Sequence, residues 1–109
     1  MRSSMDKVVL TLYEILDGYY YKEWIQEELR EVGLPSSGDK EEQIDRFLNS
    51  KAAQRTSVYE LGKRLIEALR LQELRQLAEH VGIAAQGRRE QVLKGILDSV
   101  TFEPFIKRT

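Results

Sequence analysis

The segment ELREVGLPSSGDKEEQIDRFL, residues 28–48, returns in a degraded form 49 residues later as LAEHVGIAAQGRREQVLKGIL, residues 77–97. The two segments align without a gap, and most of their glycines and apolar residues are preserved in kind. The pairs are Val32/Val81, Gly33/Gly82, Leu34/Ile83, Gly38/Gly87, Lys40/Arg89, Ile44/Leu93, Phe47/Ile96 and Leu48/Leu97. The apolar residues Val58, Leu61, Leu65 and Leu69 match Val9, Leu12, Leu16 and Tyr20 at the same offset, which extends the repeat towards the N-terminus. We therefore interpret the chain as one small unit written twice.

The composition is that of a globular protein. Of 109 residues, 41% are hydrophobic and 32% are charged, which disfavours a disordered chain. A unit of about 50 residues buries too little surface to be stable alone, so we expect the two units to pack together. The predicted organisation is a first unit at 1–50, a connection at 51–56, a second unit at 57–100 and a tail at 101–109.

Apolar periodicity predicts three short helices in each unit, at 6–17, 22–32 and 39–49 and at 58–69, 72–81 and 88–99. Gly33 is suited to end the second helix in a left-handed conformation, and Pro35 disfavours helical geometry at Leu34, the residue before it. Ser57 and Glu60 have the spacing of a capping box. The predicted fold class is thus all-α, with six short helices. In the tail, Phe102, Phe105 and Ile106 either pack back on the domain or form a docking peptide, and Pro104 disfavours a helix there.

The repeated pattern resembles the SAP motif, a member of the helix-extended-loop-helix group that also includes the LEM domains. In the first copy the resemblance covers residues 25–48, through Leu29, Gly33-Leu34-Pro35-Ser36-Ser37-Gly38, Lys40, Glu42, Ile44 and Arg46-Phe47-Leu48. The second copy, residues 74–97, is degenerate: it retains Leu74, Gly82-Ile83, Gly87, Arg88-Arg89, Val92-Leu93 and Ile96-Leu97, but has Gly95 where the family usually has a cation.

This resemblance implies two tandem units packed together, each a helix followed by a helix-extended-loop-helix. It also implies binding to DNA, often AT-rich and with little base readout, whereas related modules bind proteins instead. In the first copy the corresponding contact residues would be Ser36, Ser37, Gly38 and Lys40. Fold analogy alone does not choose between these partners.

The charge distribution favours the second copy as the DNA-binding half. Residues 1–50 have a net charge of −5 and residues 51–109 a net charge of +4. A helix N-terminus presents unpaired amides and a partial positive charge, and here it is flanked by Arg88 and Arg89. We expect phosphate contacts at Gly87, Arg88 and Arg89, a sugar or base contact from Gln86, and an extension of the surface by Arg75 and Lys94. The alternative is a solvated charged helix end.

The first copy is acidic at the equivalent helix start. Asp39, Glu41 and Glu42 surround Lys40 and would repel phosphate, and Asp39 stands where the family commonly has a cation. Glu27 and Glu31 are spaced to share a helix face. This acidic surface is either a solvated face, a site for a basic protein partner, or a face shielded from DNA.

The remaining residues give little support to other classes of function. Trp24 and Tyr20 are expected in the core rather than in base stacking, and His80 is expected to cap a helix or lie on the surface. One histidine without cysteine predicts no metal site, and the sequence has no catalytic motif. We therefore expect no enzyme, no cofactor and no small-molecule substrate.

The absence of a long apolar segment, of a signal peptide and of cysteine predicts no membrane association and an intracellular location. That location is the cytoplasm or nucleoid in a prokaryote, or the nucleus in a eukaryote. The predicted function is binding of double-stranded DNA, mainly through the second unit. The alternative is a protein interaction module that uses the acidic first unit or the apolar C-terminal tail, and binding to RNA is a third hypothesis.

Overall fold

The computed structural model describes residues 7–103, apart from the side chain of Ala52. Six helices of eight to eleven residues and one single-turn helix lie between two short strands at the ends of this range. The elements are β1 (Val8–Thr11), α1 (Leu12–Tyr19), α2 (Lys22–Glu31), α3 (Lys40–Leu48), α4 (Lys51–Gln54), α5 (Val58–Glu67), α6 (Leu71–His80), α7 (Arg89–Ser99) and β2 (Val100–Glu103).

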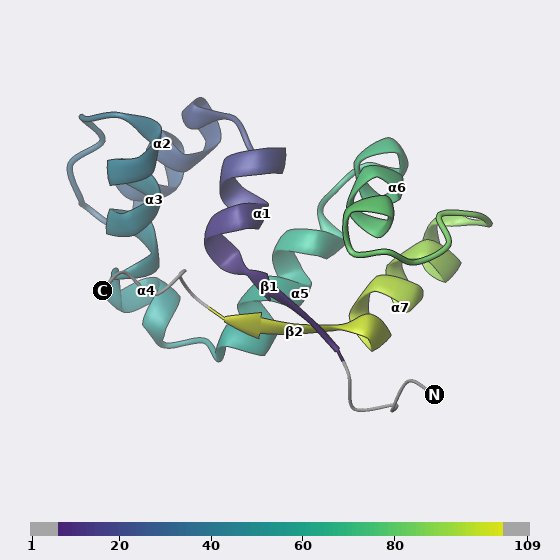
Figure 1. The fold of residues 1–109 in the computed structure, drawn as a ribbon. Helices are drawn as coiled ribbons and strands as arrows, with labels where there is room; N and C mark the ends of the chain where they lie inside the picture. Colours follow the sequence, from purple (N-terminus) through teal and green to yellow (C-terminus); the bar gives the residue numbers. More distant parts are fainter. Residues whose placement is uncertain (1–6, 104–109) are drawn as a thin grey trace.

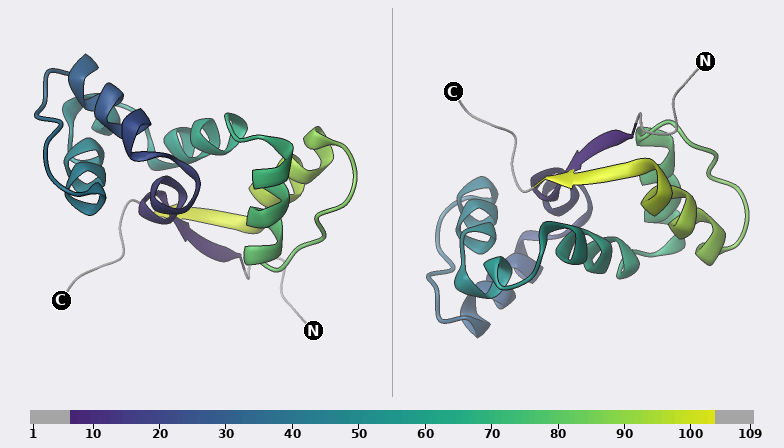
Figure 2. Two further views of the ribbon diagram at one scale, coloured as in Figure 1. Left: turned by 90° about the horizontal axis from the view of Figure 1, so that it is seen from above. Right: turned by 90° about the horizontal axis from the view of Figure 1, so that it is seen from below.

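The helices are arranged as two lateral pairs on a central pair (Figure 1). Helices α1 and α5, one from each unit, pack against each other in the middle. The α2–α3 pair lies on one side and the α6–α7 pair on the other, and the views from above and below show the same separation (Figure 2). This arrangement gives the molecule extents of 46 × 30 × 22 Å.

The prediction of an all-α fold is confirmed only in part: the structure is mostly helical, but β1 and β2 also form a two-stranded parallel sheet. Val8 pairs with Val100 and Leu10 with Phe102, so the sheet joins the start of the first unit to the end of the second. Leu10 and Val100 are buried in this sheet. The described fold is therefore mostly helical with a small sheet that ties the two units together.

The predicted helix at 6–17 begins later than expected, at Leu12. The Thr11 hydroxyl accepts a hydrogen bond from the Glu14 amide, and the Glu14 carboxylate accepts one from the Thr11 amide, both at 3.0 Å. This capping box fixes the helix start, and the preceding β-branched Val8 and Val9 favour a strand. The other five predicted helices are present, with ends within two residues of the predicted ones.

The sequence repeat is also a repeat of backbone conformation. Gly33 and Gly82 have φ of 75° and 81°, and Gly38 and Gly87 have φ of 101° and 100°. The first of these pairs ends α2 and α6, where the amide of the following residue donates to the carbonyl five positions earlier, from Leu34 to Leu29 and from Ile83 to Ala78. The prediction of a left-handed glycine at the helix end is thereby confirmed.

The connection and the tail contain more structure than the sequence suggested. Residues 51–56 include α4. Ser50 caps the start of this helix, because its hydroxyl accepts a hydrogen bond from the Ala53 amide. Phe102, in β2, packs its ring against Tyr59 with ring centroids 5.8 Å apart, so this part of the tail packs back on the domain. Phe105 and Ile106 lie outside the described residues.

One apolar cluster contains buried residues of both units, which confirms that the units pack together. Its fully buried members include Leu12, Ile15, Leu16, Ile25, Leu29, Ile44, Ile66, Leu74, Leu77 and Ile96. The Tyr20 hydroxyl adds a polar link between the units, because it donates to the Leu65 carbonyl at 2.6 Å. No helix in the part of the chain described here is long and apolar enough to cross a membrane.

Candidate nucleic-acid interface

The start of α7 is exposed and lacks a side-chain cap. Gly87 leads into it, the Arg88 amide donates to the Gln91 side-chain oxygen at 2.8 Å, and no side chain accepts a hydrogen bond from a first-turn amide. Within residues 7–103 the amides of Arg89 and Glu90 have no hydrogen-bond partner. Two amide donors therefore remain available where the partial positive charge of the helix is concentrated.

Arg88 and Gln86 project from this exposed loop and helix start. Both residues are exposed, and neither side chain forms a hydrogen bond or ion pair with any described residue. The structure thus places Gln86, Gly87 and Arg88 together at one accessible corner of the second unit.

Arg89 has a structural contact that sequence reasoning missed. Its guanidinium donates to the carbonyl oxygens of Glu67 and Leu69, the second at 3.0 Å. These carbonyls lie at the C-terminal end of α5, where a cation is favourable. Arg89 therefore caps α5.

Lys40 makes the equivalent contact in the first unit. Its ammonium group donates to the Asp17 carbonyl in the last turn of α1, at 2.6 Å. Lys40 and Arg89 are the one pair of cations at equivalent positions of the repeat. In each unit this cation links the start of the third helix to the end of the first helix. This shared role explains the basic residue at that position without nucleic acid.

Arg75 and Lys94 are exposed and unpaired among the described residues, but no described contact brings them to Arg88. Lys94 lies midway in sequence between Val92 and Ile96, which are buried. It therefore lies on the side of α7 opposite to these two residues. These two cations are accessible but are not organised with the helix start.

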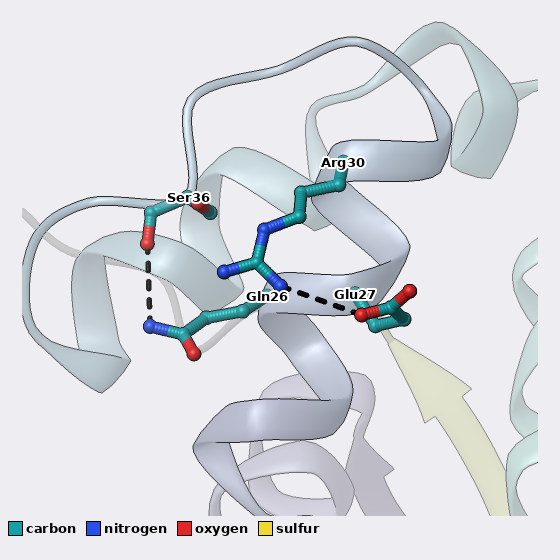
Figure 3. Close-up of polar contacts among 4 residues, drawn as sticks. All are labelled: Gln26, Glu27, Arg30 and Ser36. Atoms are coloured by element: carbon teal, nitrogen blue, oxygen red, sulfur yellow. Dashed lines mark hydrogen bonds and ion pairs between the residues drawn. The ribbon is translucent and has the colours of Figure 1, made fainter.

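The loop of the first unit is held by hydrogen bonds to its carbonyl oxygens. The side-chain amide of Gln43 donates to the carbonyl of Ser36 at 2.8 Å and to that of Gly38 at 3.0 Å. The Arg46 guanidinium donates to the carbonyls of Pro35 and Ser37, at 2.7 and 2.8 Å. Gln26 also reaches Ser36 from α2, beside the Arg30–Glu27 ion pair (Figure 3). The carbonyls of residues 35–38 are therefore already engaged.

The start of α3 is closed to an anion by its own acids. The Asp39 carboxylate accepts from the Glu42 amide at 2.9 Å, and the Glu42 carboxylate accepts from the Asp39 amide at 3.3 Å. Ser36, Ser37, Gly38 and Lys40 therefore lie beside a helix end whose dipole is already complemented.

The aromatic residues Tyr20 and Trp24 pack internally, as predicted. Trp24 has its ring 4.5 Å from that of Tyr20 and 6.0 Å from that of Phe47. Burial, reinforced by Glu73 and Glu28, raises the pKa of Tyr20 to about 12. Tyr21 is 79% exposed, and His80 is exposed at the end of α6.

The positive charge of the second half is not carried by the folded second unit. Residues 57–103 contain seven Lys and Arg and seven Asp and Glu. The excess of the second half comes from Lys51 and Arg55 in the connection and from Lys107 and Arg108 in the tail. Any attraction of the second unit for DNA must therefore be local to the α7 start.

The sequence reasoning also missed a basic cleft in the first unit. Its volume is about 630 Å³, and it lies where α2, α3 and α4 meet. Its lining includes Arg46, Lys51 and Arg55, two of which fall in the segment predicted to be a featureless connection. Only their charge was visible in the sequence.

No family model, curated protein or solved structure matches this chain.

Proposed function

We propose that the chain is a pair of SAP-like modules that binds duplex DNA through the start of α7, mainly by phosphate contacts. The observation that carries this proposal is the difference between the two equivalent helix starts. Asp39 caps α3 with a carboxylate, whereas α7 has Arg88 at the same position and no side-chain cap. The amides of Arg89 and Glu90, like that of Lys40 in α3, have no described partner. An anion bound at α7 would accept from these amides and pair with Arg88.

The neutral balance of residues 57–103 sets the expected character of the binding. Phosphate contacts are few and local, so affinity is modest and depends on salt. The side chains at this corner offer one guanidinium and one carboxamide, Arg88 and Gln86, which supports little reading of base sequence.

The decisive experiment is a fluorescence titration of labelled duplex DNA with the wild type and with Arg88→Ala. We expect the variant to bind more weakly and to lower the slope of log K against log salt by up to about 0.9, the value for one lost phosphate contact. Arg89 should be left intact, since it caps α5 and its loss would confuse binding with stability.

The matched control is Arg64→Ala, which removes from α5 an exposed arginine whose side chain has no partner within residues 7–103. It should leave the titration unchanged. If Arg88→Ala binds DNA like the wild type, the α7 start is not the site; if the wild type does not bind duplex DNA at all, the proposal is wrong. Competition between duplex DNA and single-stranded RNA distinguishes DNA binding from RNA binding.

A protein interaction through the acidic first unit is the second candidate. Glu27, Glu28 and Glu31 crowd one side of α2, and burial followed by the charge of Glu31 raises the pKa of Glu28. Such crowding would be relieved by a basic partner. If a basic protein partner still binds after Glu28→Gln and Glu31→Gln, this acidic face is not its binding site.

A further inference from the structure

The basic cleft of the first unit combines apolar walls with a positive rim. Val32 and Leu34, after the end of α2, supply its apolar side, and the rest of the lining is Arg46, Asn49, Ser50, Lys51 and Arg55. No acidic residue is among these lining residues. An apolar surface with cations alone around it fits an occupant that is both apolar and acidic.

Comparison of equivalent residues in the two units shows that this opening is particular to the first unit. Val32 is 38% exposed, whereas its equivalent, Val81, is 6% exposed. Arg46 is replaced by Gly95, where the Ile83 side chain lies 3.5 Å from the place of a Cβ atom. Lys51 corresponds to Val100, which is buried in β2. The second unit thus fills with its own apolar residues the region that the first leaves uncovered.

The cations of the cleft differ in how they are held. Arg46 is fixed by its bonds to the carbonyls of Pro35 and Ser37, so it forms a rigid wall. The side chains of Lys51 and Arg55 are exposed and form no hydrogen bond or ion pair with a described residue. Two positive charges are therefore free to pair with an incoming anion.

We propose that this cleft binds an acidic peptide segment of a protein partner, with an apolar side chain on Val32 and Leu34 and carboxylates at Lys51 and Arg55. A DNA backbone is the poorer occupant, because it offers no apolar group for the exposed valine. The α2–α3 loop is already fixed by its internal bonds, so little ordering opposes binding. This inference concerns a surface different from the α7 start and does not depend on DNA binding.

The test is selection from a displayed library of random 12-residue peptides on the full chain, with counter-selection on Lys51→Glu/Arg55→Glu. We expect the surviving peptides to combine several Asp or Glu with a Leu, Ile or Phe. A synthetic peptide of the enriched sequence should bind the double variant about tenfold more weakly, equivalent to about 1.4 kcal/mol. Val32→Ser should weaken the same peptide without altering the charge.

The matched control is Lys22→Glu/Arg64→Glu, which reverses the charge of two exposed cations that do not line the cleft and whose side chains have no partner in the described part of the chain. It should bind the peptide like the wild type, and circular dichroism should show that both double variants are folded. Arg88→Ala should also bind the peptide normally, which separates this proposal from the one on DNA.

Three results would overturn the inference: no enriched peptides, enriched peptides without acidic residues, or equal binding to the Lys51→Glu/Arg55→Glu variant. A parallel titration with duplex DNA provides a fourth. If that variant loses DNA binding while no selected peptide depends on the cleft, the cleft is a nucleic-acid surface instead.

Discussion

Replacement of Gly62 by alanine tests the contact between α5 and the strand that the sequence did not reveal. Gly62 is buried in the middle of α5, next to the Phe102 ring. A Cβ atom there would lie 2.5 Å from Cδ1 and 2.6 Å from Cγ of Phe102, whereas carbon atoms pack at about 3.5–4.0 Å. The ring would have to move by roughly 1 Å, and the pairing of β2 with β1 opposes this movement.

Two terms of opposite sign set the expected magnitude. Alanine in a helix interior gains about 1 kcal/mol over glycine, and overpacking of a core costs about 1–3 kcal/mol. Since the overlap is made with ring carbons rather than with the end of a flexible chain, we place the cost at the upper end of that range. Gly62→Ala should therefore lower the free energy of unfolding by about 1–2 kcal/mol and Tm by about 5–10 °C.

The chain offers a matched control in Gly95→Ala. Gly95 is also inside a helix, but its added Cβ would meet only the Ile83 Cδ1 atom, at 3.5 Å. This variant should gain about 0.5–1 kcal/mol. Urea unfolding followed by far-UV circular dichroism measures both, and a double mutant with Phe102→Ala should turn Gly62→Ala from harmful to neutral or favourable. A Gly62→Ala protein as stable as Gly95→Ala would refute the packing of Phe102 on α5.

Two further predictions concern stability. Arg89→Ala should lower the free energy of unfolding by about 1–2 kcal/mol, because it removes charged hydrogen bonds to the end of α5. Arg88→Ala, its control, should change the free energy of unfolding by less than about 0.5 kcal/mol. Equal thermal denaturation curves for the two variants would contradict the capping role of Arg89. For Tyr20, the pKa is raised from 10.0 to about 12, so the unfolded chain releases this proton first. The stabilising contribution is complete below pH 10 and is lost as the pH rises towards 12. Tyr20→Phe should therefore show a shallower loss of stability between pH 10 and 12 than the wild type, and identical slopes would show that the phenol is not protected.

The helices could be predicted because their signals are local. Gly33 and Gly82 mark helix ends by a conformation that only glycine adopts easily, and the apolar spacing of Ile44, Phe47 and Leu48 needs no information from elsewhere. The helix at 6–17 was misjudged because Val8 and Leu12 also fit a helical period, although Thr11 and Glu14 carried a capping-box signal at the true start.

The sheet and the site could not be predicted in the same way, because they depend on partners distant in the sequence. Val100–Glu103 becomes a strand by pairing with β1, and residue patterns within the tail do not reveal that partner. The arginine pair at 88 and 89 illustrates the same limit for function. In the sequence the two arginines are indistinguishable. In the structure Arg89 donates to two carbonyls at the C-terminal end of α5, whereas the Arg88 side chain has no partner among the described residues.

The parallel sheet also has a consequence for how the chain folds during its synthesis. Val8 pairs with Val100, so the earliest described strand must wait for a partner made 92 residues later. At a translation rate of roughly 5–20 residues per second, this wait lasts about 5–18 s. The α2–α3 pair can form from local contacts within that time, whereas β1 keeps an unpaired edge. The first unit therefore keeps an unpaired strand, open to misassociation, until β2 has been synthesised, and the β1–β2 sheet forms after the α2–α3 pair.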